Sequence, residues 1–424
     1  MPQLSASNRS QLAYKLEGIY PANFGVLQAG SGTNLNMLSE TLDFSVKNVQ
    51  SNQIRSDGQI ADITQVGATT QGGIALEAQY REYDPFIENV MKAPFTAYGT
   101  LGVSAAMTGT LTATSTTVLT NSVATAGSDL WTLLDKGQWF TLIPVTGASQ
   151  AVKDYLAKKP FRVSLLVAPT ATVITLDAST PIDATIITAP LAVGWKFTSS
   201  RLYNGTTTQV LKSYSMEVGH SDVSVFRQYL GMMASKYSLK LSVGAIVTGA
   251  IDFMGKLMTT PMAVVTGMGA ATASQTFTPA NATKGVIDVY ENEVALSATT
   301  YVKSAEMSID ISLRMQDAIG VFGTSGLAAG TYKVMGKLEM YLADTVVYNK
   351  LLSGVATAIT LPLLDVNGNG YIYYFPKVKY TIAKVAVGGL DQDNMLSLDW
   401  TAVVQTDVTS PAFGKTCVIY RVGV

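Results

Sequence analysis

The chain has 424 residues, a formal net charge of -1, 14% charged residues and 47% hydrophobic residues. At roughly 100 to 200 residues per domain, this length corresponds to two to four domains, and a charged fraction well below the usual ~25% excludes an intrinsically disordered chain. The balanced charge also excludes a strongly basic nucleic-acid binder. A surface with so few charges is poorly soluble alone, so we expect a protein that lives in a large assembly.

Membrane insertion, secretion and disulfide bonding are not expected. The most apolar stretch, residues 241–273, is interrupted by Asp252, Lys256 and Pro261, whereas a membrane helix needs ~18 or more uncharged residues. The first residues lack the basic and apolar regions of a secretory signal, so synthesis in a cytoplasm is expected. One cysteine, Cys417, and one histidine exclude an intrachain disulfide and argue against a Cys/His metal site.

Apolar and polar residues alternate along many segments, which is typical of strands with one buried face. In chain order, the alternation predicts a strand at residues 72–80 and another at 309–316. Short helices are expected at 84–91 and 344–352, each opened by an aspartate able to cap it and the first with a proline in its first turn. The sequence therefore predicts a mainly β fold.

Two segments differ in composition from the rest. Residues 106–191 combine Thr/Ser/Ala alternation with several prolines, which indicates a separate small β domain inserted into the main fold. Residues 258–295 begin with a Gly-, Ala- and Thr-rich stretch and are expected to be a linker or surface arm.

With those segments set aside, one order of elements occurs twice: a strand, a glycine-led strand, a short helix and three further strands. We therefore expect two duplicated modules, each a β-sandwich or barrel with a short helix. The first module comprises residues 1–105 and 192–257, and the second comprises residues 296–424.

Two motifs resemble reactive sites but favour plain turns. The sequence DVNGNG at 365–370 begins like a calcium loop, but its twelfth position is Pro376 instead of a glutamate, so a hairpin turn is favoured. His220 is followed directly by Ser221 and Asp222, and three consecutive residues cannot converge as a catalytic triad. We predict no catalytic, cofactor-binding or metal-ligating residues, and no enzyme.

Several motifs together carry a family resemblance. The most specific is the block of Ser51, Asn52, Ile54, Arg55, Ser56 and Asp57, followed by the glycine-led strand at 72–80 and an acidic aromatic turn into the helix at 84–91. The opening NRSQLAYKLEGIYP and the later SYSMEVGH, GNGYIYYFPKV and FGKTCVIYRV also match. Over nearly all its length except the insert, the chain resembles the major tail tube proteins of long-tailed, siphovirus-type bacteriophages.

The resemblance implies a virion structural protein of the phage tail, made in the host cytoplasm. Its copies would stack as rings into a hollow tube that conducts double-stranded DNA from capsid to host. Implied partners are further copies of the chain, the tape measure, tail terminator and distal tail proteins, and DNA in transit. Because related tubes have sixfold order with one module per subunit, two modules predict three chains per ring with pseudo-sixfold symmetry; six chains are the alternative.

A channel that lets DNA slide should be polar and not basic, because each phosphate contact to Lys or Arg adds affinity. The polar faces of the expected strands give lumen candidates, namely Glu77, Gln79, Asp310, Ser312 and Glu339. Arg81, Arg314 and Lys337 fall on the same faces and are expected to pair with these acids or lie near the channel ends. The alternative is that these residues face the tube exterior, and the insert is expected on the outer surface.

Other functions remain open at this point. A contractile-type inner tube or a capsid decoration protein would share the composition, but neither requires the Ser51–Asp57 block or the duplication. A glycan-binding β protein should show clustered tryptophans, whereas Trp131, Trp139, Trp195 and Trp400 are dispersed.

Overall fold

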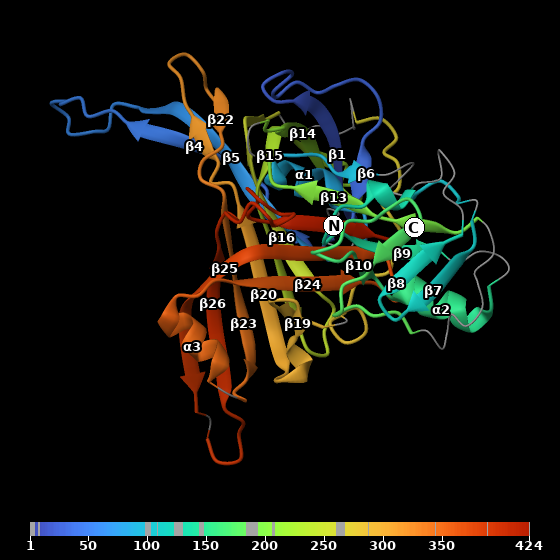
Figure 1. Cartoon of the computed structure of the whole chain (residues 1–424). Helices are drawn as coiled ribbons and strands as arrows, with labels where there is room; N and C mark the ends of the chain where they lie inside the picture. The colour runs from blue at the N-terminus through green and yellow to red at the C-terminus, as the bar shows by residue number, and fades with distance from the viewer. Residues whose placement is uncertain are drawn as a thin grey trace.

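The computed structural model describes most of the chain. The described residues are 5–6, 9–97, 103–107, 109–122, 130–143, 148–183, 194–205, 208–259, 268–286, 288–343, 345–387 and 389–423. Strands predominate and only three α-helices occur in these ranges (Figure 1). The mainly β fold is therefore confirmed.

The first module is built from strands on both sides of the insert. Its elements are β1 (Ser10–Ile19), β2 (Thr33–Leu35), β3 (Ser39–Glu40), β4 (Asp43–Gln50), β5 (Ile63–Glu77), α1 (Asp84–Met91), β6 (Thr96–Ala97), β13 (Ser200–Tyr203), β14 (Lys212–His220), β15 (Val225–Ser242), β16 (Thr248–Gly255) and β17 (Leu257–Met258).

The second module follows in the C-terminal part. Its elements, with the short strands that precede it, are β18 (Tyr290–Glu291), β19 (Val294–Ala295), η4 (Leu296–Ala298), β20 (Val302–Asp310), β21 (Arg314–Gln316), β22 (Gly326–Ala328), β23 (Lys333–Tyr341), α3 (Val346–Ser353), β24 (Thr357–Leu364), β25 (Gly370–Ala386), β26 (Met395–Ala402) and β27 (Val418–Val422).

One continuous sheet, here called the main sheet, joins the two modules. Its strand order is β4-β5-β16-β15-β20-β23-β26-β25, and all neighbours are antiparallel. The first four strands and the last four strands repeat the same connectivity, and β14–β15 corresponds to β24–β25. The duplication predicted from the order of elements is therefore present in the sheet topology.

The two longest strands, β15 and β25, connect the main sheet to a second layer. The first part of β15 pairs with β14, and its second part pairs with β16 and β20. The first part of β25 pairs with β24 and β27, and its second part pairs with β26. Each module is thus a sandwich in which one strand crosses between layers; the described sheets are open, so the barrel alternative is wrong.

The main sheet has one apolar and one polar face, because side chains alternate along each strand. The apolar face belongs to the largest hydrophobic core and includes Leu239, Met307, Leu338, Leu398 and Trp400, each at most 2% exposed. This burial sets the register of the sheet, since a one-residue slip would move every apolar side chain to the polar face.

Helix α1 has the predicted bounds, but its predicted cap is wrong. Its N-cap residue is Tyr83 without a side-chain cap hydrogen bond, and Asp84 lies inside the helix. The Asp84 carboxylate instead accepts hydrogen bonds from Tyr371 and Arg421 of the second module. Helix α3 begins at Val346, and the predicted cap at 344 lies outside the described residues.

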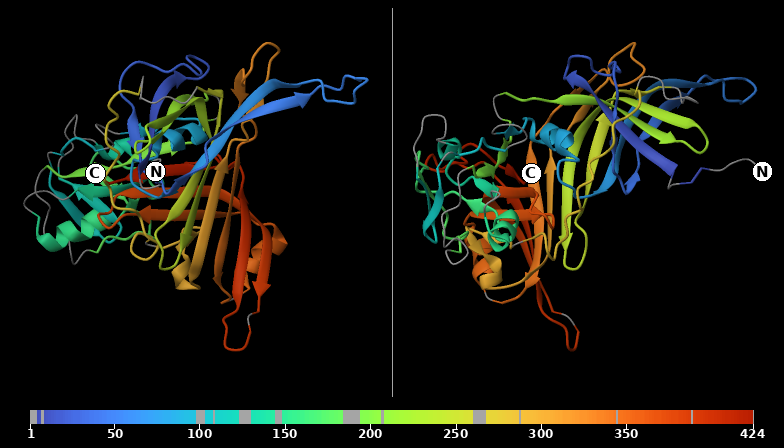
Figure 2. Two further views of the ribbon diagram at one scale, coloured as in Figure 1. Left: turned by 180° about the vertical axis from the view of Figure 1, so that it is seen from behind. Right: turned by 90° about the vertical axis from the view of Figure 1, so that its right-hand side faces the viewer.

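The insert has its own hydrophobic core, which runs from Met107 to Phe197 and so extends a few residues past the predicted boundary at 191. Its elements are β7 (Leu111–Ser115), β8 (Val118–Asn121), η3 (Leu130–Leu133), β9 (Trp139–Ile143), α2 (Gln150–Lys158), β10 (Phe161–Arg162), β11 (Val173–Thr175) and β12 (Lys196–Thr198). Helix α2, which Ser149 caps, was not predicted. The insert lies to one side of the modules (Figures 1 and 2).

Two further stretches depart from their predicted form. The strand expected at 309–316 is interrupted after Asp310, because Ser312 has a left-handed backbone (φ 47°). In the expected linker or arm, the described residues 268–286 lie against the first module. The Thr272 amide donates to the carbonyl of Gly32, and the Gln275 amide donates to Glu82 Oε2 at 2.8 Å.

Candidate functional site

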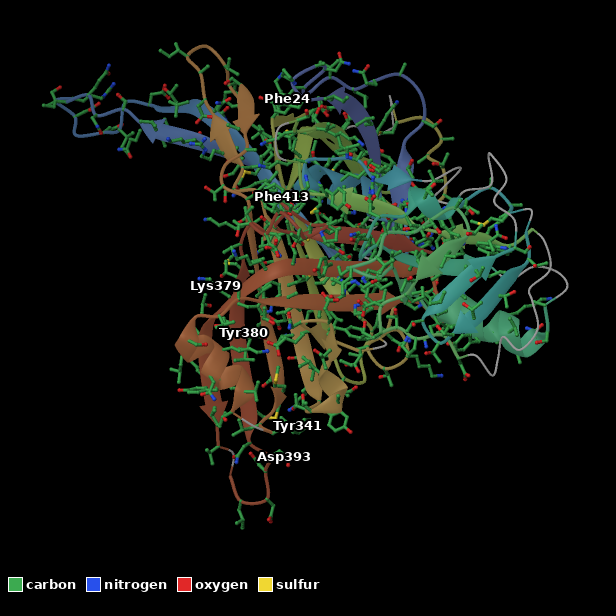
Figure 3. All side chains as sticks on the ribbon, in the orientation of Figure 1. Phe24, Tyr341, Lys379, Tyr380, Asp393 and Phe413 are labelled. Carbon is green, nitrogen blue, oxygen red and sulfur yellow. The ribbon has the colours of Figure 1, made fainter. Side chains whose placement is uncertain are left out.

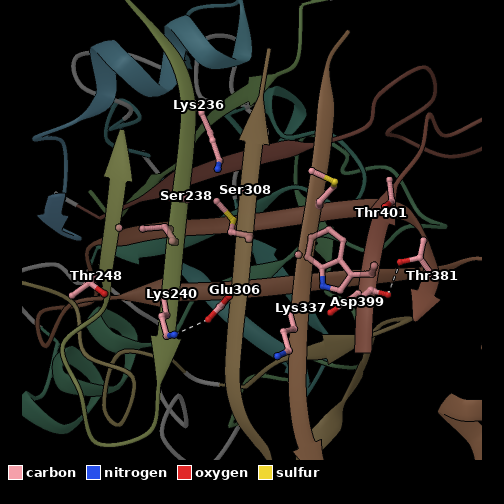
Figure 4. Close-up of a pocket in the computed structure, with 16 residues that line it drawn as sticks. Lys236, Ser238, Lys240, Thr248, Glu306, Ser308, Lys337, Thr381, Asp399 and Thr401 are labelled. Atoms are coloured by element: carbon pink, nitrogen blue, oxygen red, sulfur yellow. Dashed lines mark hydrogen bonds and ion pairs between the residues drawn. The ribbon is translucent and has the colours of Figure 1, made fainter. Parts of the chain in front are cut away.

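The polar face of the main sheet carries a surface groove. This groove of about 680 Å³ is lined mainly by residues of β15, β20, β23 and β26. Figure 4 looks onto this face and shows charged and hydroxyl side chains that point from neighbouring strands into the groove. The labelled side chains are Lys236, Ser238, Lys240, Thr248, Glu306, Ser308, Lys337, Thr381, Asp399 and Thr401.

Lysines on this face lie beside carboxylates. Lys240 Nζ is 2.8 Å from Glu306 Oε1 across the β15–β20 pairing. Lys337 lies in register with Glu306 on one side and Asp399 on the other. Opposite charges facing each other across strands stabilise a sheet modestly, and here they also leave few unbalanced positive charges on the groove.

Three of the five lumen candidates share this polar face. Glu77 ends β5 opposite Thr248, and Asp310 ends β20 in register with Lys236. Glu339 lies on β23, where its Oε2 accepts a hydrogen bond from Ser304 Oγ at 3.1 Å. The sheet therefore brings Glu77, Asp310 and Glu339 to one surface although they are far apart in sequence.

The other two candidates lie beyond the strand ends. Gln79 follows β5, and its Oε1 accepts a hydrogen bond from Asn36 Nδ2 at 3.0 Å. Ser312 follows β20, and its backbone amide donates to Asp310 Oδ1 at 2.6 Å. The alternation that suggested both residues continues in sequence past the point where the strands stop.

The basic residues expected on the same faces separate in the structure. Lys337 is on the polar face, as described above. Arg314 lies in the β21–β22 hairpin, outside the main sheet. Arg81 has a left-handed backbone (φ 62°) and its guanidinium carbon lies 4.9 Å from the centre of the Tyr80 ring.

The Ser51–Asp57 block forms the tip of the hairpin between β4 and β5, which projects from the body (Figure 1). None of these residues is in a strand. Arg55 forms an ion pair with Asp57 at 2.7 Å, and the Gln53 amide contacts Ser51 Oγ. Ile54 is fully exposed, so this motif is a projecting surface and not part of the core.

The main sheet ends in two edges that no described strand covers. One edge is β4, which pairs only with β5. The other is the second half of β25, which pairs only with β26 and carries exposed Ile382 and Val385. Figure 3 shows Tyr341 and Asp393 at the end of the sheet where the β25–β26 hairpin projects, far from Phe24. Unpaired edges offer backbone donors and acceptors to a further strand.

Comparison with known proteins decides the family. The sequence matches the family described as Phage tail tube protein over residues 7–402. The chain belongs to the phage tail tube protein family. The match includes both modules and the insert, and it makes the protein a structural component of the phage tail. No curated protein matches the sequence.

The described residues of this tail tube family protein contain no helix long and apolar enough to span a membrane. They also contain no group of three or more His, Cys, Asp or Glu side chains placed to hold a metal ion. Asp365, from the calcium-like motif, accepts hydrogen bonds from the amides of Asn367 and Asn369 in the β24–β25 turn, as the hairpin interpretation predicts.

Sequence reasoning missed much of the polar face of this tail tube family protein. Lys236, Lys240, Glu306 and Asp399 all line its groove. The signal was available, because polar residues alternate with apolar ones in KYSLKLS and EMSID. What the sequence lacked was the β15–β20 pairing, which brings the two alternating runs side by side.

Proposed function

We propose that copies of this chain form stacked rings that build the hollow tail tube of a siphovirus-type phage and conduct double-stranded DNA. The main sheet carries this proposal: it has one apolar face, one polar face and two open edges. An open sheet removes its edges by pairing with further strands until a ring closes. Contacts that close laterally give a ring, whereas axial contacts that do not close give a tube.

The proposed ring has three chains and pseudo-sixfold symmetry. The support is the repeated strand order, in which β4-β5-β16-β15 and β20-β23-β26-β25 are equivalent units. Three chains then supply six equivalent units. The other tail proteins expected from the family, namely the tape measure, terminator and distal tail proteins, would contact the ends or the lumen of this tube.

The proposed lumen is the polar face of the main sheet. DNA phosphates bind tightly to unbalanced positive charge, and the lysines at the centre of this face have carboxylates opposite them, as in the pair Lys240–Glu306. Figure 4 also shows strands of the insert behind the main sheet when the polar face is toward the viewer. This arrangement supports a position for the insert on the outside of the tube.

Electron microscopy of the purified chain tests the function and the ring size. We expect hollow tubes, and three chains per ring in a reconstruction. Six chains per ring would contradict the proposed stoichiometry, and a chain that forms no rings or tubes under any assembly condition would contradict the function.

A charge reversal tests the lumen assignment. Replacing Glu77 and Glu339 by lysine should leave tubes intact and slow DNA ejection from virions, because the new lysines attract phosphate. A matched reversal in the insert, Asp154→Lys on exposed α2, should leave ejection kinetics unchanged. Equal kinetics in the two variants would place Glu77 and Glu339 outside the channel.

A further inference from the structure

Within the chain, the pairing of β15 with β20 joins the two modules. Neighbouring copies in a ring would need an equivalent strand pairing. There the second half of β15 pairs with β20, from Lys236 opposite Asp310 to Ser242 opposite Ser304. In the repeat, β25 is the equivalent of β15, and β3 with β4 is the equivalent of β20. The two edges of the main sheet that no described strand pairs with are therefore the two halves of an equivalent junction.

The residues of β15 and β25 can be matched one to one, because each strand has a bulge at the equivalent position. Each strand has a register shift where it pairs with the following strand. At the first shift, Ser235 Oγ donates to the carbonyl of Asp252 at 3.0 Å. At the second, Thr381 Oγ1 donates to the carbonyl of Asp399 at 3.2 Å. Ser235 and Thr381 are thus equivalent, and the residues after each correspond one to one.

The residues of β3–β4 can be matched to those of β20 through two equivalent glycines on the neighbouring strands. Gly72 on β5 and Gly336 on β23 each pack so closely on the neighbouring strand that a Cβ would collide with a backbone carbonyl. The carbonyl facing Gly72 belongs to Thr41, and the one facing Gly336 belongs to Glu306. Thr41 and Glu306 are therefore equivalent positions.

We propose that the second half of β25 pairs with β3–β4 of the next copy in the register that β15 and β20 use within the chain. This pairing rests on the proposed function, because it needs copies arranged side by side. Since Lys240 lies opposite Glu306, Ala386 lies opposite Thr41 of the next copy. The remaining pairs are Val385 with Leu42, Lys384 with Asp43, Ala383 with Phe44 and Ile382 with Ser45.

The proposed register brings apolar side chains of the two copies together on the apolar face. Ala383 and Phe44 both pack partly against the main core, so their pairing extends the apolar face. Val385 would meet Leu42, which is 2% exposed on the same side. A slip by one residue would place Phe44 opposite Lys384 and turn its ring toward the polar face.

The proposed register also places Lys384 opposite a carboxylate, that of Asp43 in the next copy. Lys384 is exposed and lies opposite Ser397 in its own chain, with no carboxylate in register. Asp43 is exposed and lies opposite Gln71. Across the proposed junction they face each other on the polar face, where the internal junction has Ser238 opposite Ser308. Opposite charges directly across neighbouring strands favour pairing, and like charges there oppose it.

Engineered cysteines test the register in assembled tubes. Directly opposed strand residues have Cα atoms ~4.5–5.5 Å apart, within disulfide reach. We expect Ile382→Cys with Ser45→Cys to cross-link neighbouring chains into covalent closed rings on mild oxidation with diamide. The control, Ala383→Cys with Ser45→Cys, should not cross-link, because adjacent side chains point to opposite faces.

The native thiol does not interfere, because Cys417 is buried and its burial raises the pKa of the thiol far above neutral. Cross-linking of the control pair instead of the test pair would overturn the register while leaving the tube function in place. Wild-type chains that do not assemble would overturn the function and this pairing together.

A charge swap provides an independent measurement. Lys384→Glu and Asp43→Lys should each weaken the junction by up to roughly fivefold and so lower the yield of rings in sedimentation, while circular dichroism shows a folded chain. The double variant should restore the yield. Failure of the double variant to recover, with both single variants impaired, would show that the two residues do not face each other.

Discussion

The two module helices, α1 and α3, occupy equivalent places in the repeat but differ sharply in burial. Both have eight residues and end at a left-handed C-cap, Lys92 and Gly354. Counted from these caps, Phe86 corresponds to Tyr348; Phe86 is completely buried, whereas Tyr348 is 38% exposed. At another equivalent pair, Val90 is buried and Leu352 is 71% exposed.

The cause of the difference is the neighbouring module. Helix α1 lies where the second module continues the sheet, and Tyr371 and Arg421 of that module bind the Asp84 carboxylate. Helix α3 packs on β25, the strand that forms a free edge. The apolar side chains Tyr348 and Leu352 of α3 are therefore exposed in the single chain, and under the proposed ring the next copy would cover them.

The largest expected effect is a difference in the unfolding free energy lost when equivalent residues of α1 and α3 are replaced by alanine. Phe86 packs edge-on against Tyr14, Tyr214 and Phe253, with ring centres 5.0–5.1 Å apart. Phe86→Ala should lower the free energy of unfolding by about 3–5 kcal/mol, whereas Tyr348→Ala should change it by about 0.5 kcal/mol. Urea denaturation of the unassembled chain measures both, and equal losses would contradict the comparison.

A smaller effect is expected at the contact between α1 and the second module. Tyr371→Phe removes the hydroxyl that donates to Asp84 Oδ1 and leaves the buried carboxylate to Arg421 alone. The expected loss is about 1–3 kcal/mol in the same denaturation experiment. Tyr348→Phe on exposed α3 serves as the matched control and should have no measurable effect.

The smallest effect on the chain itself is expected at Leu352. Because this side chain is mostly exposed, Leu352→Ser should leave the free energy of unfolding within about 0.5 kcal/mol of wild type. It should nevertheless slow ring formation, followed by light scattering, if the next copy covers α3. Unchanged assembly kinetics would show that this face stays exposed in the tube.

Local patterns in the sequence predicted strands where the structure has them. The strand expected at 72–80 overlaps β5, and the strand expected at 309–316 overlaps the end of β20 and all of β21. Such strands can be predicted because alternation is a local property with a period of two. The helix at 84–91 was equally clear from its proline and its apolar spacing.

The wrong predictions concern features that depend on contacts with residues far away in the sequence. Asp84 was expected to cap its helix, but its partners come from residues nearly 300 or more positions later. Gln79 and Ser312 continue an alternating pattern beyond the end of a strand, and only the left-handed backbone at Ser312 shows where β20 stops. The polar face required the register between β15 and β20, which depends on pairing across the modules.

The junction between β15 and β20 has a kinetic consequence for assembly. Within one chain, this joint forms between strands that are already covalently connected, so its formation does not depend on the concentration of chains. In the proposed ring of three duplicated chains, every second joint would therefore be complete before any two molecules meet. Nucleation would then require fewer encounters between chains. Dilution would weaken only the strand pairings between chains, which are half of the pairings in the proposed ring.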